Sequence, residues 1–143
     1  MKLLSLAGLG AMLVALLGLW ITRSLFSPNL VIIGLQLAAV LLMIWARVTF
    51  GRRRFHAAAN PTAGGLVTSG PYHFVRHPIY ASICLFLWAG VLVNFSLLSI
   101  SLGALGSAGA VVRILCEEHL LVRQYPEYRA YAIRTRRLLP GLW

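Results

Sequence analysis

Four long apolar runs separated by polar joints dominate the sequence. They cover residues 3–21, 30–46, 79–93 and 95–112, which is 19, 17, 15 and 18 residues. A helix needs about 20 apolar residues to cross about 30 Å of hydrocarbon. The pattern therefore predicts an all-α integral membrane bundle of about four transmembrane helices in a single domain, with a short third helix.

Small residues in two of these runs favour close helix packing in lipid. Ala7, Ala11 and Ala15 recur every four residues in the first run, and glycine, alanine and serine fill most of positions 103–110 in the fourth. We expect a compact bundle with no room for a pore. The first run begins like a signal peptide but lacks a small-x-small cleavage site, so it is expected to remain as an anchor.

The composition agrees with a membrane location. Of the 143 residues, 59% are hydrophobic and 11% are charged, against about 25% charged in an ordinary soluble domain. These figures exclude a disordered chain, a coiled coil and a secreted disulfide scaffold. Cys84 and Cys116 belong to separate apolar segments and have no His or Cys partner at metal-ligand spacing, so we interpret both as small core residues.

Basic residues are concentrated on one side of the predicted bundle. The chain has 13 Lys and Arg against 3 Asp and Glu, a formal net charge of +10. The charges lie in joints between apolar runs, and no basic helix face with interleaved aromatics occurs, so no nucleic-acid partner is expected. With four crossings and both termini in the cytoplasm, every basic residue except Arg23 faces the cytoplasm. In a bacterium this would be the plasma (inner) membrane.

Two segments outside the apolar runs have their own patterns. The joint between residues 47 and 77 is long and contains Asn-Pro, Gly-Gly and Gly-Pro turn signals, and such loops are often functional. After the fourth run, Tyr125-Pro126-Glu127 suits a helix start, and the segment to Arg137 predicts an interfacial amphipathic helix. Residues 138–143 then resemble a membrane-surface anchor.

The start of the third helix is the first candidate site. Pro78 suits the first helical position and His77 the cap before it, so unpaired backbone N–H groups and the Arg76 cation favour a bound carboxylate. Tyr80 follows His77 by three residues and so shares its face. The alternative is that Arg76 and His77 only mark the membrane interface.

The second candidate is the acid pair Glu117 and Glu118, which we place in the last turn of the fourth helix. If the hairpin turns about Asn94, the start of the third helix lies level with about position 111, and the acids lie about 9 Å further along the axis. A ligand of nucleoside size could then contact both. A purely structural alternative is pairing with Arg113, four residues before Glu117.

The tyrosines and histidines have simpler interpretations. Tyr72, Tyr80, Tyr125, Tyr128 and Tyr131 all fall on the cytoplasmic flank, where an aromatic belt accounts for all of them except Tyr80. The remaining histidines have no spacing that suggests a metal site. The chain has no Asp and its cysteines are apolar in context, so no Ser-His-Asp or Cys-His nucleophile set is expected.

An ordered set of motifs covers roughly residues 64–140. It consists of Gly70-Pro71-Tyr72, Arg76-His77-Pro78-Ile79-Tyr80, Glu117-Glu118 and Tyr128-x-x-Tyr131, continuing up to Pro140. This set resembles the isoprenylcysteine carboxyl methyltransferase and phospholipid methyltransferase group of integral membrane enzymes. Residues 1–50, which would form two anchoring helices, match no motif of that group.

The resemblance implies methyl transfer from S-adenosyl-L-methionine, held near the cytoplasmic surface. The cofactor-binding residues that it implies are Gly64, Gly65, Leu66, Val67, Tyr72, His77, Pro78, Ile79, Tyr80 and Glu117. The two candidate sites above add Arg76 and Glu118 to this set. Arg113 matches the family arginine that faces the carboxylate of the methyl acceptor. The tail matches, at Tyr128, Tyr131 and Arg134, are displaced by one residue from the expected spacing.

The implied acceptor is lipophilic: a small molecule, a membrane lipid or a lipid-modified group. The chain is shorter than eukaryotic members of the group, so no dedicated region for a large prenylated protein is expected. Two other interpretations stay open. One is a sterol-reductase-like enzyme that uses NADPH, with residues 52–54 holding its extra phosphate; the other is a non-catalytic membrane component.

Overall fold

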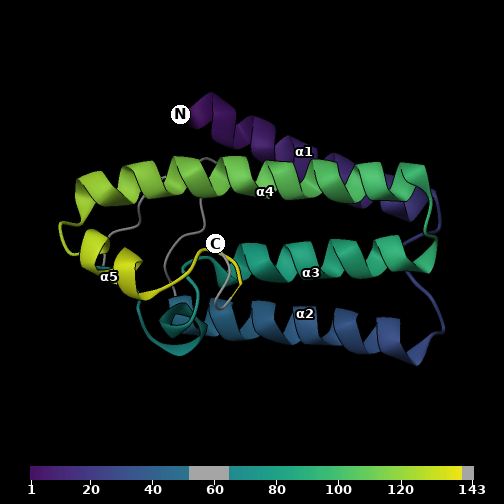
Figure 1. The fold of residues 1–143 in the computed structure, drawn as a ribbon, viewed down its shortest axis with the longest axis horizontal. Coiled ribbons are helices and arrows are strands. Elements are labelled where there is room, and N and C mark those ends of the chain that lie inside the picture. The colour runs from purple at the N-terminus through teal and green to yellow at the C-terminus, as the bar shows by residue number, and fades with distance from the viewer. Residues whose placement is uncertain (52–64, 140–143) are drawn as a thin grey trace.

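Four long helices lie side by side in the computed structural model, which describes residues 1–51 and 65–139. They alternate in direction, as Figure 1 shows, and a short helix packs at one end. The helices are α1 (Lys2–Ile21), α2 (Leu30–Phe50), α3 (Pro78–Val93), α4 (Leu97–Gln124) and α5 (Tyr128–Arg134), with a 3-10 turn, η1 (Gly70–His73), before α3. The described residues form no named strand, which confirms the predicted all-α class.

Three of these helices are long and apolar enough to cross a membrane. They are α1, α2 and α4, with 20, 21 and 28 residues, whereas α3 has 16. The N-terminus and α5 lie at the same end of the bundle, at the left of Figure 1. The prediction of four crossings stays a prediction, because α3 is shorter than the other three.

Polar side chains define where α2 and α4 begin. The Asn29 side chain accepts from Val31 N at 2.9 Å, which satisfies one of the free N–H groups of the first turn of α2. Ser96 and Ser99 form a reciprocal capping box at the start of α4. These caps explain why the two helices start at Leu30 and Leu97.

The helix α4 continues further than predicted. The apolar run ends at residue 112, but the helix extends to Gln124, and the charged side chains of Arg113, Glu117 and Glu118 are paired inside the protein. Glu117 and Glu118 therefore lie about two turns before the C-terminus of α4. Their predicted place in the last turn is wrong, and the unfavourable effect of the helix dipole on them is correspondingly smaller.

Close contact between α1 and α4 depends on glycine. A Cβ on Gly8 would lie 2.7 Å from Gly109 O, and a Cβ on Gly109 would lie 2.5 Å from Gly8 O. The predicted small-residue contact is therefore present, but the buried stripe of α1 is shifted from the one we expected, and Ala7 is exposed. The stripe consists of Ser5, Gly8, Met12, Ala15 and Leu19.

Substituting Gly109 with alanine tests this contact. The new methyl group would overlap the backbone of α1, so we expect Gly109→Ala to lower the free energy of unfolding by about 2 kcal/mol. Gly10→Ala is the control, since nothing lies within 4 Å of its Cβ position. Denaturant titration of both variants in detergent checks this, and equal stability of the two would contradict the proposed packing.

Candidate functional site

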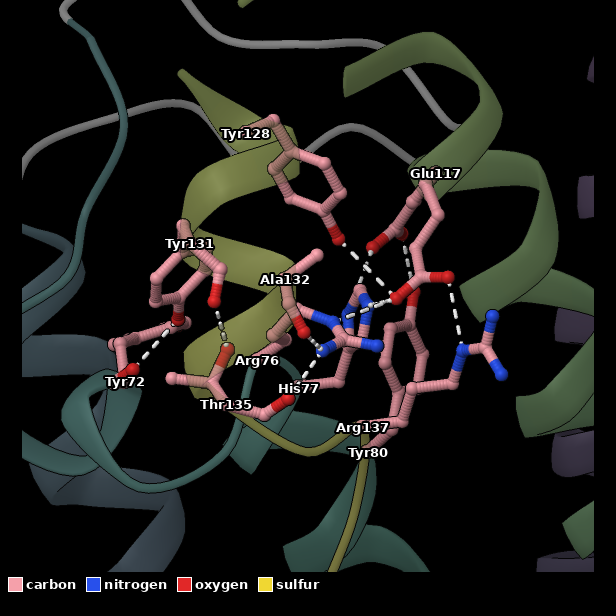
Figure 2. A network of polar contacts seen from close by, with 11 residues as sticks. Tyr72, Arg76, His77, Tyr80, Glu117, Tyr128, Tyr131, Ala132, Thr135 and Arg137 are labelled. Atoms are coloured by element: carbon pink, nitrogen blue, oxygen red, sulfur yellow. Dashed lines mark hydrogen bonds and ion pairs between the residues drawn. The ribbon is translucent and has the colours of Figure 1, made fainter. Parts of the chain in front are cut away.

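A cluster of polar side chains lies where α3 begins, between α4 and α5 (Figure 2). We call it the polar cluster. It consists of Arg76, His77, Tyr80, Arg113, Glu117, Glu118, Tyr128 and Arg137, and is held together by hydrogen bonds and ion pairs. Six of these eight residues were predicted as site residues from the sequence.

The register of the α3–α4 hairpin brings His77 directly to the acids. His77 Nε2 lies 3.4 Å from Glu118 Oε1, and His77 Nδ1 lies 3.9 Å from Glu117 Oε2. We expected His77 to lie level with position 111, which is wrong by about two turns. The joint between the two helices runs from residue 94 to residue 96, so its centre lies beyond Asn94, and this accounts for part of the shift of α4 relative to α3.

Glu118 is surrounded by donors from three other parts of the chain. Its Oε1 accepts from Arg76 Nε at 2.9 Å and from the Tyr128 hydroxyl at 3.2 Å. Its Oε2 accepts from Arg137 Nε at 2.9 Å, and only 12% of the side chain is exposed. With His77 also adjacent, this carboxylate links α4 to the start of α3, to α5 and to the C-terminal segment.

Glu117 has fewer partners and is more open. Its carboxylate accepts from the Tyr80 hydroxyl and lies 3.6 Å from Arg113 Nη2, with 26% of the side chain exposed. The predicted structural pairing with Arg113 is therefore present. The two acids differ in that Glu118 is largely enclosed by protein groups, whereas Glu117 retains an accessible carboxylate.

Arg113 connects this site to α1. The residue is 1% exposed, and its Nε donates to the Tyr80 hydroxyl at 2.8 Å while Nη1 donates to Ser5 O at 3.2 Å. Tyr80 in turn donates to Glu117, so its hydroxyl joins the cation and the carboxylate. A buried guanidinium of this kind is stable because the Glu117 carboxylate lies nearby and because Nε and Nη1 both have acceptors.

The C-terminal segment packs beside the start of α3. Arg76 N donates to Arg136 O at 2.7 Å and His77 N donates to Arg137 O at 3.0 Å, with a parallel bridge between Val75 and Arg136. These bonds need an extended backbone, which is why α5 ends at Arg134 and not at Arg137 as predicted. Its first residue is also later than predicted, at Tyr128.

The side chain of Arg76 reinforces this connection. Its Nη1 donates to Ala132 O at 2.8 Å and to Thr135 O at 2.5 Å, while its Nε binds Glu118. The interpretation of Arg76 and His77 as mere markers of the membrane interface is therefore wrong. Both residues are structural partners of α4 and the C-terminal segment.

Three tyrosines assigned to an aromatic belt take part in internal contacts instead. Tyr128 is buried against Glu118, and Tyr131 donates to Tyr72 O at 2.6 Å, as Figure 2 shows. Burial raises the pKa of Tyr131 to about 12, so its hydroxyl stays protonated and remains a donor. The sequence analysis missed this role, although the three-residue spacing of Tyr128 and Tyr131 places both side chains on one helical face and could have indicated it.

The remaining predicted cofactor residues lie in the loop and at the start of α3. Gly64 lies outside the described residues; Gly65 has φ +82°, and Leu66 is half-buried. Val67, Tyr72 and Ile79 pack together with α2 through Ala46. Pro78 is buried as the first residue of α3. Arg134, one of the tail matches displaced by one residue, is exposed.

Comparison with known proteins identifies the family. The family model described as phospholipid methyltransferase matches residues 29–128, which is more than two thirds of the chain. The chain belongs to the phospholipid methyltransferase family. The resemblance read from the motifs is thereby confirmed, and with its three long apolar helices the chain is a membrane protein. The matched region includes all of α2, α3 and α4 but not α1.

Two curated relatives are similar over most of the chain. One is the nickel-cobalt-cadmium resistance protein NccN of Alcaligenes xylosoxydans xylosoxydans, 32% identical over 86% of this chain and 53% of the relative. The other is the cobalt-zinc-cadmium resistance protein CzcN of Cupriavidus metallidurans, 34% identical over 87% of this chain and 53% of the relative. The chain thus spans about half the length of the curated relatives it matches. No solved structure matches the chain.

Proposed function

We propose that this protein is an S-adenosyl-L-methionine-dependent methyltransferase that modifies a lipophilic acceptor at the cytoplasmic face of the membrane. The family supports methyl transfer. The observation that carries the proposal is the meeting of His77, which follows Arg76 at the start of α3, with an accessible carboxylate, that of Glu117. When bound, the cofactor supplies a methyl group already activated on a sulfonium.

The chemistry of these side chains fits a zwitterionic nucleoside. The Arg76 cation at the start of α3 suits its carboxylate, while Glu117 suits an ammonium group or ribose hydroxyls. Glu118 suits this role less, because four protein groups already surround it. Of the two predicted acids, we therefore assign ligand contact to Glu117 and a positioning role to Glu118.

The protein's own contribution is orientation and exclusion of water. Methyl transfer to an acceptor that is already nucleophilic needs the reacting atoms aligned in a dry site and does not need a general base. Tyr80 is held between Arg113 and Glu117, so the buried end of the polar cluster is rigidly connected. We assign Arg113 the orientation of the polar end of the acceptor, because its cation lies at that buried end.

A calorimetric titration separates this proposal from its alternatives. We expect heat of binding when detergent-solubilised protein is titrated with S-adenosylhomocysteine, and none with NADP, because Glu117 opposes a ligand that carries several phosphates. Binding of NADP alone would favour the sterol-reductase-like enzyme. Binding of neither ligand, by protein shown to be folded, would favour the non-catalytic membrane component.

A further inference from the structure

An apolar groove lies between α1, α2 and α3. It is lined by residues between Leu9 and Leu16 of α1, between Ala39 and Ile44 of α2, and between Ser82 and Leu87 of α3. The only hydroxyl in this lining, that of Ser82, donates to Ile79 O at 2.7 Å within its own helix. The groove thus presents a hydrocarbon surface.

The groove opens laterally, toward the side on which lipid would lie. Leu13 on α1 is 57% exposed, and Ile44 on α2 is 52% exposed, although both line the groove. Leu87 and Ala39, which are almost fully buried, form its floor. An apolar molecule could therefore enter from the bilayer between α1 and α2 without crossing the polar cluster.

The volume of the groove favours a ligand with a single hydrocarbon chain. It measures about 360 Å³. An apolar cavity of about 150 Å³ holds benzene, so on the same scale the groove accommodates roughly 14 carbon atoms. This is the size of a single acyl or isoprenoid chain and is too small for the two chains of a diacyl phospholipid.

The inner end of the groove adjoins the polar cluster. Met12 and Ile83 line the groove, and both pack in the apolar cluster that contains Tyr80. The hydroxyl of Tyr80 accepts from Arg113 and donates to Glu117. A chain lying in the groove would thus carry a polar head toward Tyr80 and Arg113. Much of one wall comes from α1, which lies outside the region that the family model matches.

From this continuity we infer that the groove holds the hydrocarbon tail of the methyl acceptor and that the acceptor is a single-chain amphiphile with a small polar head. This inference rests on the proposed function for the identity of the acceptor. It adds the binding site of the acceptor, the number of hydrocarbon chains that the acceptor carries, and the direction in which its hydrocarbon chain lies.

Photolabelling in phosphatidylcholine nanodiscs tests the inference. The probes are a fatty acid with a diazirine on its chain and a phosphatidylcholine whose acyl chain carries the same diazirine. We expect the fatty acid to label residues 9–16 of α1 and 39–44 of α2, and the phosphatidylcholine to label the outer surface of the bundle. Equal labelling of the groove by both probes, or labelling by neither, would overturn the inference.

A matched pair of variants gives the test its specificity. Leu13→Trp fills the groove, and we expect it to reduce groove labelling by the fatty acid about tenfold, the change for loss of about two methylene contacts. Leu4→Trp is the control, because Leu4 is also 57% exposed but lies nine positions away, on the opposite side of α1. Ile44→Trp, on the other wall, is expected to act as Leu13→Trp does.

Titration of the same samples with S-adenosylhomocysteine distinguishes the two possible failures. If the nucleoside binds and the groove is not labelled, the inference about the acceptor is wrong while the proposed function stands. If the groove is labelled and the nucleoside does not bind, the groove binds a lipid chain but the proposed function is wrong. Loss of nucleoside binding in Leu13→Trp, with normal binding in Leu4→Trp, would contradict the separation of the two sites.

Discussion

Replacing Glu118 with alanine is expected to destabilise the protein by about 3 kcal/mol. The substitution removes the carboxylate that Arg76 and Arg137 share, and it leaves Arg76, whose side chain is only 9% exposed, without its main ionic partner. Losing one member of a buried, hydrogen-bonded charge pair costs more than losing an exposed ion pair, because the remaining charge stays poorly solvated.

The effect should be largest in the C-terminal segment. Glu118 binds Tyr128 of α5 and Arg137 beyond it, so hydrogen exchange of residues 128–138 is expected to accelerate in Glu118→Ala before the rest of the bundle is affected. Glu127→Ala is the matched control, since Glu127 is the third acid of the chain and is exposed. Unchanged exchange in Glu118→Ala would show that this carboxylate does not hold the segment.

The second large effect is expected at Glu117, in ligand binding more than in stability, although Arg113 loses the charge of its carboxylate partner. Glutamine keeps the size of the side chain and still accepts from the Tyr80 hydroxyl, so the fold should be retained. Removing the charge deprives a bound ammonium or ribose of a charge-assisted hydrogen bond, and we expect the Kd for S-adenosylhomocysteine to rise about 30-fold.

Calorimetry on detergent-solubilised protein measures this change. Glu127→Gln serves as the control and should bind S-adenosylhomocysteine like the unaltered protein. If Glu117→Gln also binds S-adenosylhomocysteine normally while Glu118→Gln does not bind it, the roles assigned to the two acids are reversed.

The hydrophobic pattern predicted the helices well, because a continuous run of apolar residues marks a stretch of chain that is buried in lipid or in protein. The starts of α1 and α2 were placed to within one residue, and that of α3 likewise. The end of α4 was misplaced because Arg113 interrupts the apolar run, whereas in the structure its cation is buried and bonded to Tyr80 and Ser5. A pattern of polarity along one helix does not reveal such partners.

Contacts between distant residues explain the rest of the difference. The motif residues Arg76, His77 and Glu118 were singled out, yet Arg137 was not, because its contact with Glu118 depends on how the chain returns after α5. The extended segment at Arg136 likewise depends on backbone bonds to Val75 and its neighbours, 60 residues earlier. No local periodicity encodes these pairings.

The role of α1 was also underestimated. Its sequence indicated an anchor, and it lies outside the family match, but Ser5 and Gly8 contact α4 at Arg113 and Gly109. α1 therefore helps to hold a site residue and forms one wall of the apolar groove. Removing it would be expected to affect both the acceptor and the packing of α4.

The most direct test of the central claim is a structure determined with S-adenosylhomocysteine. Our account predicts that the nucleoside lies beside the polar cluster, with its carboxylate near Arg76 and His77 and a hydroxyl or ammonium group within hydrogen-bonding distance of Glu117. Density for the nucleoside at the opposite end of the bundle, beside Asn94, would contradict the account. The account would also be contradicted if the protein binds the nucleoside in solution with an affinity that does not depend on Glu117 and the structure shows no density for it beside the polar cluster.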